Sequence, residues 1–255
     1  MRRSRAEPRG AAADGVRYPA LPARGSTATD RMMVPMTTDT GTPVARAERL
    51  ALCETLLALG PDAPTLCDPW RTRDLAAHLV LRERRPDAAV GIVVGALAGH
   101  TQRVQDSLAH GDWAALVETV RTGPPVWSPT RLDAVDALVN TVELVVHHED
   151  ALRGDGAVGP RREVPERTER AVLASLRKTA SMMFRRSPVA VRLVAPGHEP
   201  IAAGPDAGDA PVVTVTGAPV ELLLLASGRA RVAALEMEGL PADVEALREA
   251  SLGMS

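Results

Sequence analysis

The residues best suited to chemistry lie in the stretch NTVELVVHHED, residues 140–150. This stretch brings carboxylates, imidazoles and an amide into an otherwise valine-rich run. Glu143 and His147 are four residues apart, which on a helix puts their Cβ atoms about 5–6 Å apart on one face. A carboxylate and an imidazole at this spacing can reach one divalent ion. A metal site is therefore the first chemistry that the pattern suggests.

Glu143 and His147 belong to a longer polar stripe, formed by Asp136, Asn140, Glu143, His147 and Asp150. At about 100° per residue these positions fall within an arc of about 80°. Such a stripe is usually the solvated face of an amphipathic helix. However, no Lys or Arg occurs between residues 132 and 152, and a face made only of potential ligands favours a cation. On the stripe alone, both interpretations stay open.

A catalytic zinc ion usually has three protein ligands and an open position, so a third ligand must come from another helix. His78 is the best candidate, because it lies among apolar residues in RDLAAHLVL, residues 73–81. A histidine in such a place is more often a core residue, but ligation explains it better beside the stripe. Asp150, one turn after His147, could orient that imidazole by a hydrogen bond, or could be an ordinary acid near a helix end.

Helical periodicity places these residues in a bundle of four helices that spans residues 43–153. The predicted helices cover 45–60, 72–84, 97–122 with a break or bend at Gly111, and 132–153. Thr72 is the predicted N-cap of the second helix, and Asp74 lies in its first turn, where the helix dipole favours an acid. The RERR run at 82–85 could contact an anionic ligand, although a solvated helix end is the simpler interpretation. Residues 1–42 lack periodicity and are expected to be disordered.

After the bundle the pattern changes to that of a small α+β domain over residues 165–255, joined by a linker at 154–164. Short β-like runs alternate with turn residues in this part. The predicted elements are a helix at 165–185, strands at 189–195, 199–203 and 211–217, a helix at 218–229, a strand around 232–238 and a helix at 241–251. The fold class expected from the whole chain is therefore α+β.

The composition argues against several classes of protein, among them nucleic-acid-binding and membrane proteins. The net charge of −2 provides no field for gripping nucleic acid or an anionic membrane, and no apolar run is long enough to span a bilayer. Cys53 and Cys67 match neither a zinc pair nor a redox pair, so two free thiols in a reducing compartment are expected, with a disulfide as the less common alternative. We expect a soluble cytoplasmic protein.

Four stretches resemble a known family: WRTRDLAAHLVLRERRPDA (70–88), GPPVWSP (123–129), VDALVNTVELVVHHED (135–150) and VTVTGAPVELLLLASGR (213–229). They are similar to the mycothiol-dependent maleylpyruvate isomerases of actinobacteria, and most similar to an uncharacterised metal-binding branch of that group. The resemblance implies a DinB-like four-helix bundle followed by a sterol-carrier-like α+β domain.

The same resemblance implies a site. The family's metal ligands, a His on the second helix and a Glu-x-x-x-His on the fourth, correspond to His78, Glu143 and His147. The ion would be divalent, zinc by preference, with mycothiol as a thiol cofactor and a small-molecule thiol or small organic acid as the partner. The Arg of the family's second-domain GR turn corresponds to Arg229, which could bind an anionic substrate or thiol. An arginine beside the carbonyl groups of a helix end is an equally good interpretation.

Three functions follow as hypotheses. The first is a metal-dependent, thiol-using isomerase or transferase. The second is a non-catalytic module in which a metal ion stabilises the bundle. The third is a plain helical bundle with a solvated acidic stripe. The position of His78 relative to Glu143 and His147 separates the first two from the third.

Overall fold

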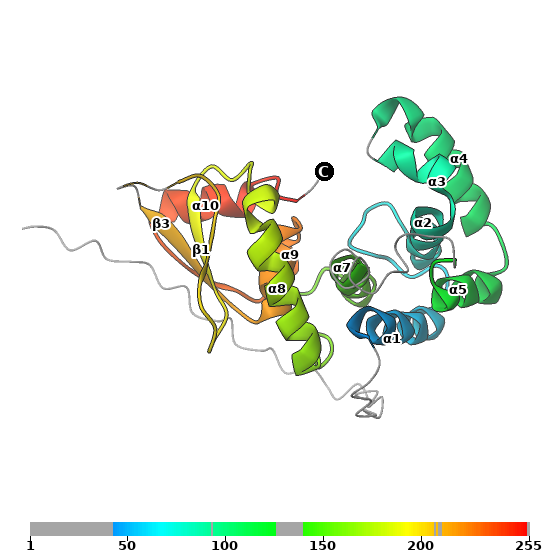
Figure 1. Cartoon of the computed structure of the whole chain (residues 1–255), viewed down its shortest axis with the longest axis horizontal. Coiled ribbons are helices and arrows are strands. Elements are labelled where there is room, and N and C mark those ends of the chain that lie inside the picture. The colour runs from blue at the N-terminus through cyan, green and yellow to red at the C-terminus, as the bar shows by residue number, and fades with distance from the viewer. Residues whose placement is uncertain (1–42, 93, 126–139, 207, 209–210, 254–255) are drawn as a thin grey trace, which may run out of the picture.

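The computed structural model describes residues 43–92, 94–125, 140–206, 208 and 211–253. Over these residues the chain forms two parts, a group of helices and a four-stranded sheet with its own helices (Figure 1). The predicted α+β class is therefore confirmed. The N-terminal segment 1–42, which was expected to be disordered, and Asp136 of the predicted stripe lie outside the described residues.

The helical part has helices in the predicted regions that the structure describes, and three short helices between residues 86 and 97 that the sequence did not predict. Its elements are α1 (Val44–Leu59), α2 (Thr72–Arg84), α3 (Pro86–Ala89), η1 (Val90–Ile92), η2 (Gly95–Leu97), α4 (Ala98–Ala109), α5 (Trp113–Thr122) and α7 (Thr141–Leu152). The predicted helix over 97–122 is two helices that meet at Gly111. Asp112 caps the second one, because its side chain accepts a hydrogen bond from the Ala115 N–H at 2.8 Å. Of the predicted helix over 132–153, the part up to residue 139 lies outside the described residues.

Helix α2, which carries His78, has the predicted bounds but a different cap. Arg71, not Thr72, is the N-cap residue, and Thr72 is the first residue of the helix. The Thr72 hydroxyl donates to the Gly60 carbonyl instead, so it ties the start of α2 to the end of α1. Asp74 lies in the first turn as predicted and accepts a hydrogen bond from the Arg71 N–H at 2.8 Å. These contacts fix the start of the helix two turns before His78.

The α+β part is built on the sheet order β2-β1-β3-β4, in which β1 and β3 are parallel and the two outer pairs are antiparallel. Its elements are α8 (Glu166–Met183), β1 (Ala190–Val194), β2 (Ile201–Ala203), β3 (Val212–Thr216), α9 (Pro219–Ala226), η5 (Ala230–Val232), β4 (Glu236–Glu238) and α10 (Pro241–Glu249). The strand predicted around 232–238 is therefore shorter, because its first residue belongs to the 3-10 turn η5 that follows α9.

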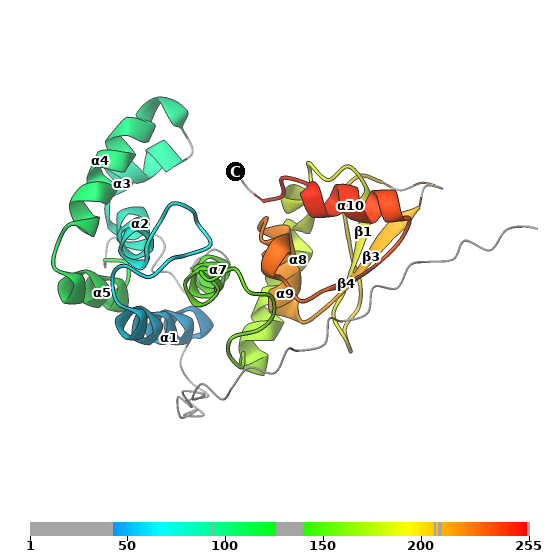
Figure 2. The same cartoon turned by 180° about the vertical axis from the view of Figure 1, so that it is seen from behind.

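Helix α7 lies between the two parts, as both views show (Figures 1 and 2). Leu144 and Ala151 belong to the hydrophobic core of the helical part, whereas Val145 and Val146 belong to the core shared with α8, α9 and the sheet. Burial on both sides explains why residues 144–151 of α7 are all buried. The helix that carries the proposed ligands therefore has no solvated face along these residues.

The segment predicted as a linker, 154–164, starts in a close contact with the bundle. A Cβ atom on Gly154 would lie 1.9 Å from the Pro64 carbonyl oxygen, so only glycine allows this approach. No helix among the described residues is long and apolar enough to cross a membrane.

Candidate metal centre

The three predicted ligands come together between α2 and α7. Glu143 Oε1 lies 3.6 Å from His78 Nε2 and 3.2 Å from His147 Nε2, and the three ligand atoms all lie within 4.8 Å of one another. Both histidines are buried, while the Glu143 side chain is 24% exposed. The stripe residues Glu143 and His147 thus face His78 on the neighbouring helix, not open solvent.

The spacing of these atoms suits a small divalent ion. Nitrogen and oxygen ligands about 2.0 Å from a tetrahedral zinc ion lie about 3.3 Å from one another. The two measured edges, 3.2 and 3.6 Å, bracket that value. The His78 and His147 rings meet edge to face at 5.3 Å between centroids, and the half-buried Trp70 ring lies 5.0 Å from the His78 ring. Trp70 therefore forms part of the wall beside the cluster.

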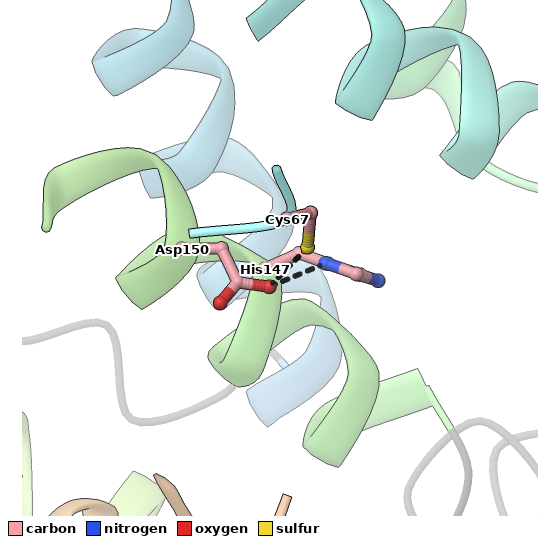
Figure 3. Close-up of side chains that lie close together, drawn as sticks. All are labelled: Cys67, His147 and Asp150. Carbon is pink, nitrogen blue, oxygen red and sulfur yellow. Dashed lines mark hydrogen bonds and ion pairs between the residues drawn. The ribbon is translucent and has the colours of Figure 1, made fainter. Parts of the chain in front are cut away.

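A second group lies on the other side of the same imidazole. Asp150 Oδ2 lies 3.0 Å from His147 Nδ1 and accepts a hydrogen bond from the Cys67 thiol at 3.1 Å (Figure 3). Cys67, His147 and Asp150 also satisfy the distances of a possible metal site. The carboxylate of Asp150 thus occupies the position from which it can orient the ring of His147.

Cys67 is a functional candidate that the cysteine spacing does not reveal. It lies in the loop between α1 and α2, which is tied to α7 by a hydrogen bond of 3.0 Å from the Leu66 N–H to the Asp150 carbonyl. Both cysteines are free, as expected. Burial raises the pKa of Cys53 to about 11, whereas Cys67 is half-buried beside the cluster. The only sequence signal is that the loop PTLCDPW leads directly into the helix that carries His78.

Arg229 reaches this second group from the end of α9. Its Nε and Nη2 donate to Asp150 Oδ1 and Oδ2 at 3.0 and 2.8 Å, and Nη2 lies 3.4 Å from Cys67 Sγ. Nη1 donates to the Ser227 carbonyl at 2.6 Å. Arg229 therefore contacts both a helix-end carbonyl and the site. Its role in binding a substrate stays a prediction.

The cations that α7 lacks are supplied by other elements. Arg82 Nη1 donates to Asn140 Oδ1 at 2.9 Å, and Arg82 Nε lies 3.6 Å from Glu143 Oε1. Arg82 and Glu83 both belong to the RERR run, and Glu83 is buried in an ion pair with Arg49, so the interpretation of that run as a solvated helix end is wrong for both residues. The absence of Lys and Arg from α7 consequently does not leave its carboxylates uncompensated, and the geometry of the ligands carries more weight than that absence.

The surroundings set the charge of each group. Burial works to raise the pKa of Glu143, but hydrogen bonds with His147 and His78 hold it far below its usual range. Burial lowers the pKa of His78. Burial also opposes the charged form of His147, but its contacts with Asp150, Cys67 and Glu143 prevail and raise its pKa well above the usual value. For Asp150 the contacts with His147 and Arg229 outweigh burial and lower the pKa to about 2. In the absence of metal, a proton on His147 thus balances part of the carboxylate charge.

His148 and Glu149 belong to a different set of contacts, and both are buried. His148 Nδ1 lies 2.7 Å from Glu48 Oε1, and His148 Nε2 lies 2.8 Å from the Thr55 hydroxyl. Glu149 accepts hydrogen bonds from Arg153 and Arg162. Together with Glu221 these residues form a buried ion-pair network, hereafter the His148 network, made of Glu48, His148, Glu149, Arg153, Arg162 and Glu221. Its members lie far apart in the sequence, and helical spacing gives no sign of their contact.

Comparison of the chain with family models, with curated proteins and with solved structures gives no match.

Proposed function

We propose that this protein binds one divalent metal ion, zinc by preference, through His78 Nε2, Glu143 Oε1 and His147 Nε2. The observation that carries the proposal is the pair of distances from Glu143 Oε1, 3.6 and 3.2 Å, which match the edge of a zinc coordination tetrahedron. Two imidazoles and one carboxylate are a common donor set for zinc with an open coordination position. When bound, such an ion supplies a Lewis acid and lowers the pKa of a coordinated water or thiol.

The residues around the ligands prepare them for this role. Asp150 Oδ2 faces His147 Nδ1, so the proton of a neutral His147 belongs on Nδ1 and Nε2 is free to coordinate. Trp70 packs beside the His78 ring, with 5.0 Å between the ring centroids. Arg82 and Arg229 place positive charge on two sides of the cluster, which suits an anionic small molecule.

The proposed chemistry is that of a thiol-dependent isomerase or transferase, with a mycothiol-type thiol and a small organic acid as partners. It is supported by the sequence resemblance and by the two arginines beside the ligands. The alternative is a non-catalytic module in which the ion stabilises the bundle. Its support is that the ligands come from two helices, α2 and α7, which an ion would join.

Metal analysis of protein purified without a histidine tag tests the binding site. The wild-type protein should retain about one equivalent of zinc, and His78→Ala and His147→Ala should lose it. His198→Ala is the matched control, because His198 is exposed in the second part of the chain and should not change the metal content. A wild-type content under about 0.1 equivalent, even after incubation with zinc, would contradict the proposal.

The thiol-dependent chemistry needs a separate test. In the cobalt-loaded Cys67→Ser variant, an added mycothiol-type thiol should produce a sulfur-to-cobalt charge-transfer band, since the protein's own nearby thiol has been removed. If no band appears but a chelator still lowers the melting temperature, the non-catalytic alternative holds.

A further inference from the structure

Two triads of potential ligands share His147, and they differ in chemistry. The first triad is His78, Glu143 and His147, which uses Nε2 of the shared ring. The second triad is Cys67, Asp150 and His147, which uses Nδ1. A neutral imidazole has only one nitrogen with a free lone pair, so one ion at a time can take His147. The protein therefore needs a feature that decides between the two positions.

By distance alone the second triad is as suitable as the first. Asp150 Oδ2 lies 3.0 Å from His147 Nδ1 and 3.1 Å from Cys67 Sγ. Figure 3 draws both contacts as dashed lines. Ligand atoms around a tetrahedral zinc ion with one thiolate lie about 3.3–3.5 Å apart, so a small adjustment would complete the geometry. The second triad also contains a thiol, which soft divalent ions prefer to a carboxylate. Without a further feature, soft ions would be drawn to Cys67.

Arg229 already contacts two of the residues that such an ion would need as ligands, Asp150 and Cys67. Its Nη2 contacts Asp150 Oδ2 and Cys67 Sγ together, at 2.8 and 3.4 Å, and its Nε takes the other Asp150 oxygen. One guanidinium group therefore engages two of the three ligand residues of the second triad. The corresponding arginine of the first triad, Arg82, lies 3.6 Å from Glu143 Oε1 and directs a hydrogen bond to Asn140. The first triad is thus more accessible to an incoming cation.

The chain fixes Arg229 in this position. The Arg229 N–H donates to the Leu224 carbonyl at 2.8 Å, and its Nη1 donates to Ser227, so both ends of the residue are tied to the end of α9. The 3-10 turn η5 that follows is held by Arg153, which donates to the Val232 carbonyl at 3.0 Å. A side chain held from backbone to guanidinium is positioned to stay on Asp150.

We infer that Arg229 excludes metal ions from the Cys67–Asp150–His147 triad and so directs the ion to the His78–Glu143–His147 triad. The inference rests on the proposed metal site. It assigns to Arg229 a role in metal selectivity, which is different from binding a substrate. Removal of the guanidinium should convert the second triad into a thiolate-containing site for soft ions.

Cadmium titration with ultraviolet detection tests this, because cadmium bound to a thiolate gives a charge-transfer band that cadmium bound to nitrogen and oxygen does not. The wild-type protein should bind cadmium without the band. Arg229→Gln should show the band and bind cadmium at Cys67 at least 10-fold more tightly, and Arg229→Gln/Cys67→Ser should lose it. Arg231→Gln, at an exposed position two residues away, is the matched control and should behave as wild type. Should Arg229→Gln not fold, Arg229→Met keeps the aliphatic stem and is expected to give the same band.

A band in the wild-type protein, or no band in a folded Arg229 variant, would overturn the inference. Its failure can be told from failure of the proposed function by the double variant His78→Ala/Arg229→Gln. If only the first triad is wrong, wild type binds no metal but the double variant still shows the cadmium–thiolate band. If only the inference is wrong, wild type binds one ion and no Arg229 variant shows the band.

Discussion

His147 and His148 are neighbours on α7, but their side chains lie in opposite kinds of environment. Consecutive residues of a helix point about 100° apart, so these two rings face different elements. His147 faces α2 and the Cys67 loop, where another imidazole, two carboxylates and a thiol converge. His148 faces α1, where Glu48 and Thr55 take its two ring nitrogens. One helix thus presents a possible ligand cluster on one side and a buried ion-pair network on the other.

The two regions differ in how their carboxylates are satisfied. In the His148 network each Glu149 oxygen has its own guanidinium donor, Arg162 for Oε1 at 2.9 Å and Arg153 for Oε2 at 2.7 Å. Glu221 receives both terminal nitrogens of Arg153. Around His147, by contrast, Glu143 Oε1 faces two imidazoles, and its arginine is 3.6 Å away. The network around His148 thus satisfies its carboxylates with arginines and joins the two parts of the chain. In the His147 cluster Asp150 is likewise bound by Arg229, and only Glu143 keeps an oxygen that faces imidazoles alone within hydrogen-bonding distance.

Removal of Arg153 should give the largest effect on stability. In Arg153→Met the carboxylates of Glu149 and Glu221 lose donors in a buried place, where breaking an ion pair costs about 3–5 kcal/mol. Chemical denaturation of the metal-free protein measures this loss. The control is Arg161→Met, whose partner Asp155 is exposed, and the expected loss there is under about 1 kcal/mol. A loss below about 1 kcal/mol for Arg153→Met would show that the network is not structural.

Alanine at each histidine should separate the two regions. His147→Ala should weaken zinc binding at least about 100-fold, since loss of a direct ligand exceeds the 10- to 100-fold effect of the residues that orient ligands. His148→Ala should leave zinc affinity nearly unchanged but lower the free energy of unfolding by about 2 kcal/mol, because Glu48 loses a buried hydrogen bond. Zinc competition with a chromophoric chelator and urea denaturation measure the two quantities. If both variants lost zinc affinity equally, His147 would not differ from His148 as a metal ligand.

Much of the helical framework follows from the sequence because it depends on local rules. Periodicity predicts α2 at its observed bounds, and the spacing of Glu143 and His147 puts both on the side that meets His78. Turn residues likewise mark the break at Gly111. The resemblance to DinB-like and sterol-carrier-like domains stays a prediction, but the mixed α+β class does not depend on it.

The rest of the site depends on contacts between elements, which spacing along one helix does not reveal. Arg82, Arg229 and Cys67 reach the cluster from α2, from the end of α9 and from a loop. The absence of cations on α7 suggested uncompensated acids, yet arginines from elsewhere supply the charge. In the same way, Arg162 of the predicted linker pairs with buried Glu48 and Glu149. The spacing of residues along one helix can identify possible ligands. Only the packing of the other elements shows which charged side chains contact those ligands.

The pH dependence of zinc binding should report on His147. Its pKa is raised well above the usual value by contacts with Asp150, Cys67 and Glu143, which outweigh the effect of burial, so metal must displace a proton. Zinc affinity should therefore rise by up to about 10-fold per pH unit from about pH 6.5 upward, until the folded-state pKa is passed. The stability that the proton gives to the metal-free protein is fully present below about pH 6.5 and is lost as the pH rises through that folded-state pKa.

Two titrations check this prediction, one of zinc affinity and one of the melting temperature of metal-free protein. Over the same pH window, zinc affinity should rise with pH and the melting temperature of the metal-free protein should fall. His198→Ala should reproduce the wild-type curves, since that side chain is exposed and far from the ligands in the sequence. An affinity that stays constant across the window would mean that His147 is not the group that metal deprotonates.

The smallest expected effect is the change in zinc affinity when Arg82 is replaced. Whether the affinity rises or falls tests directly whether the arginines of the two regions have different roles. Arg82 lies 3.6 Å from Glu143 and partly neutralises it, so Arg82→Gln should strengthen zinc binding. At 3.6 Å, with both side chains in partial contact with solvent, this pair is expected to contribute about 1 kcal/mol, which corresponds to a two- to fivefold change. Arg85→Gln is the control, because Arg85 pairs with exposed Asp87. Loss of the Arg82 guanidinium would thus strengthen zinc binding at His147, whereas loss of the Arg153 guanidinium would lower the stability of the fold around His148. If Arg82→Gln weakens zinc binding instead, Arg82 serves to hold Asn140 and Glu143 in place. The arginine of the His147 cluster would then have a structural role, like the arginines of the His148 network.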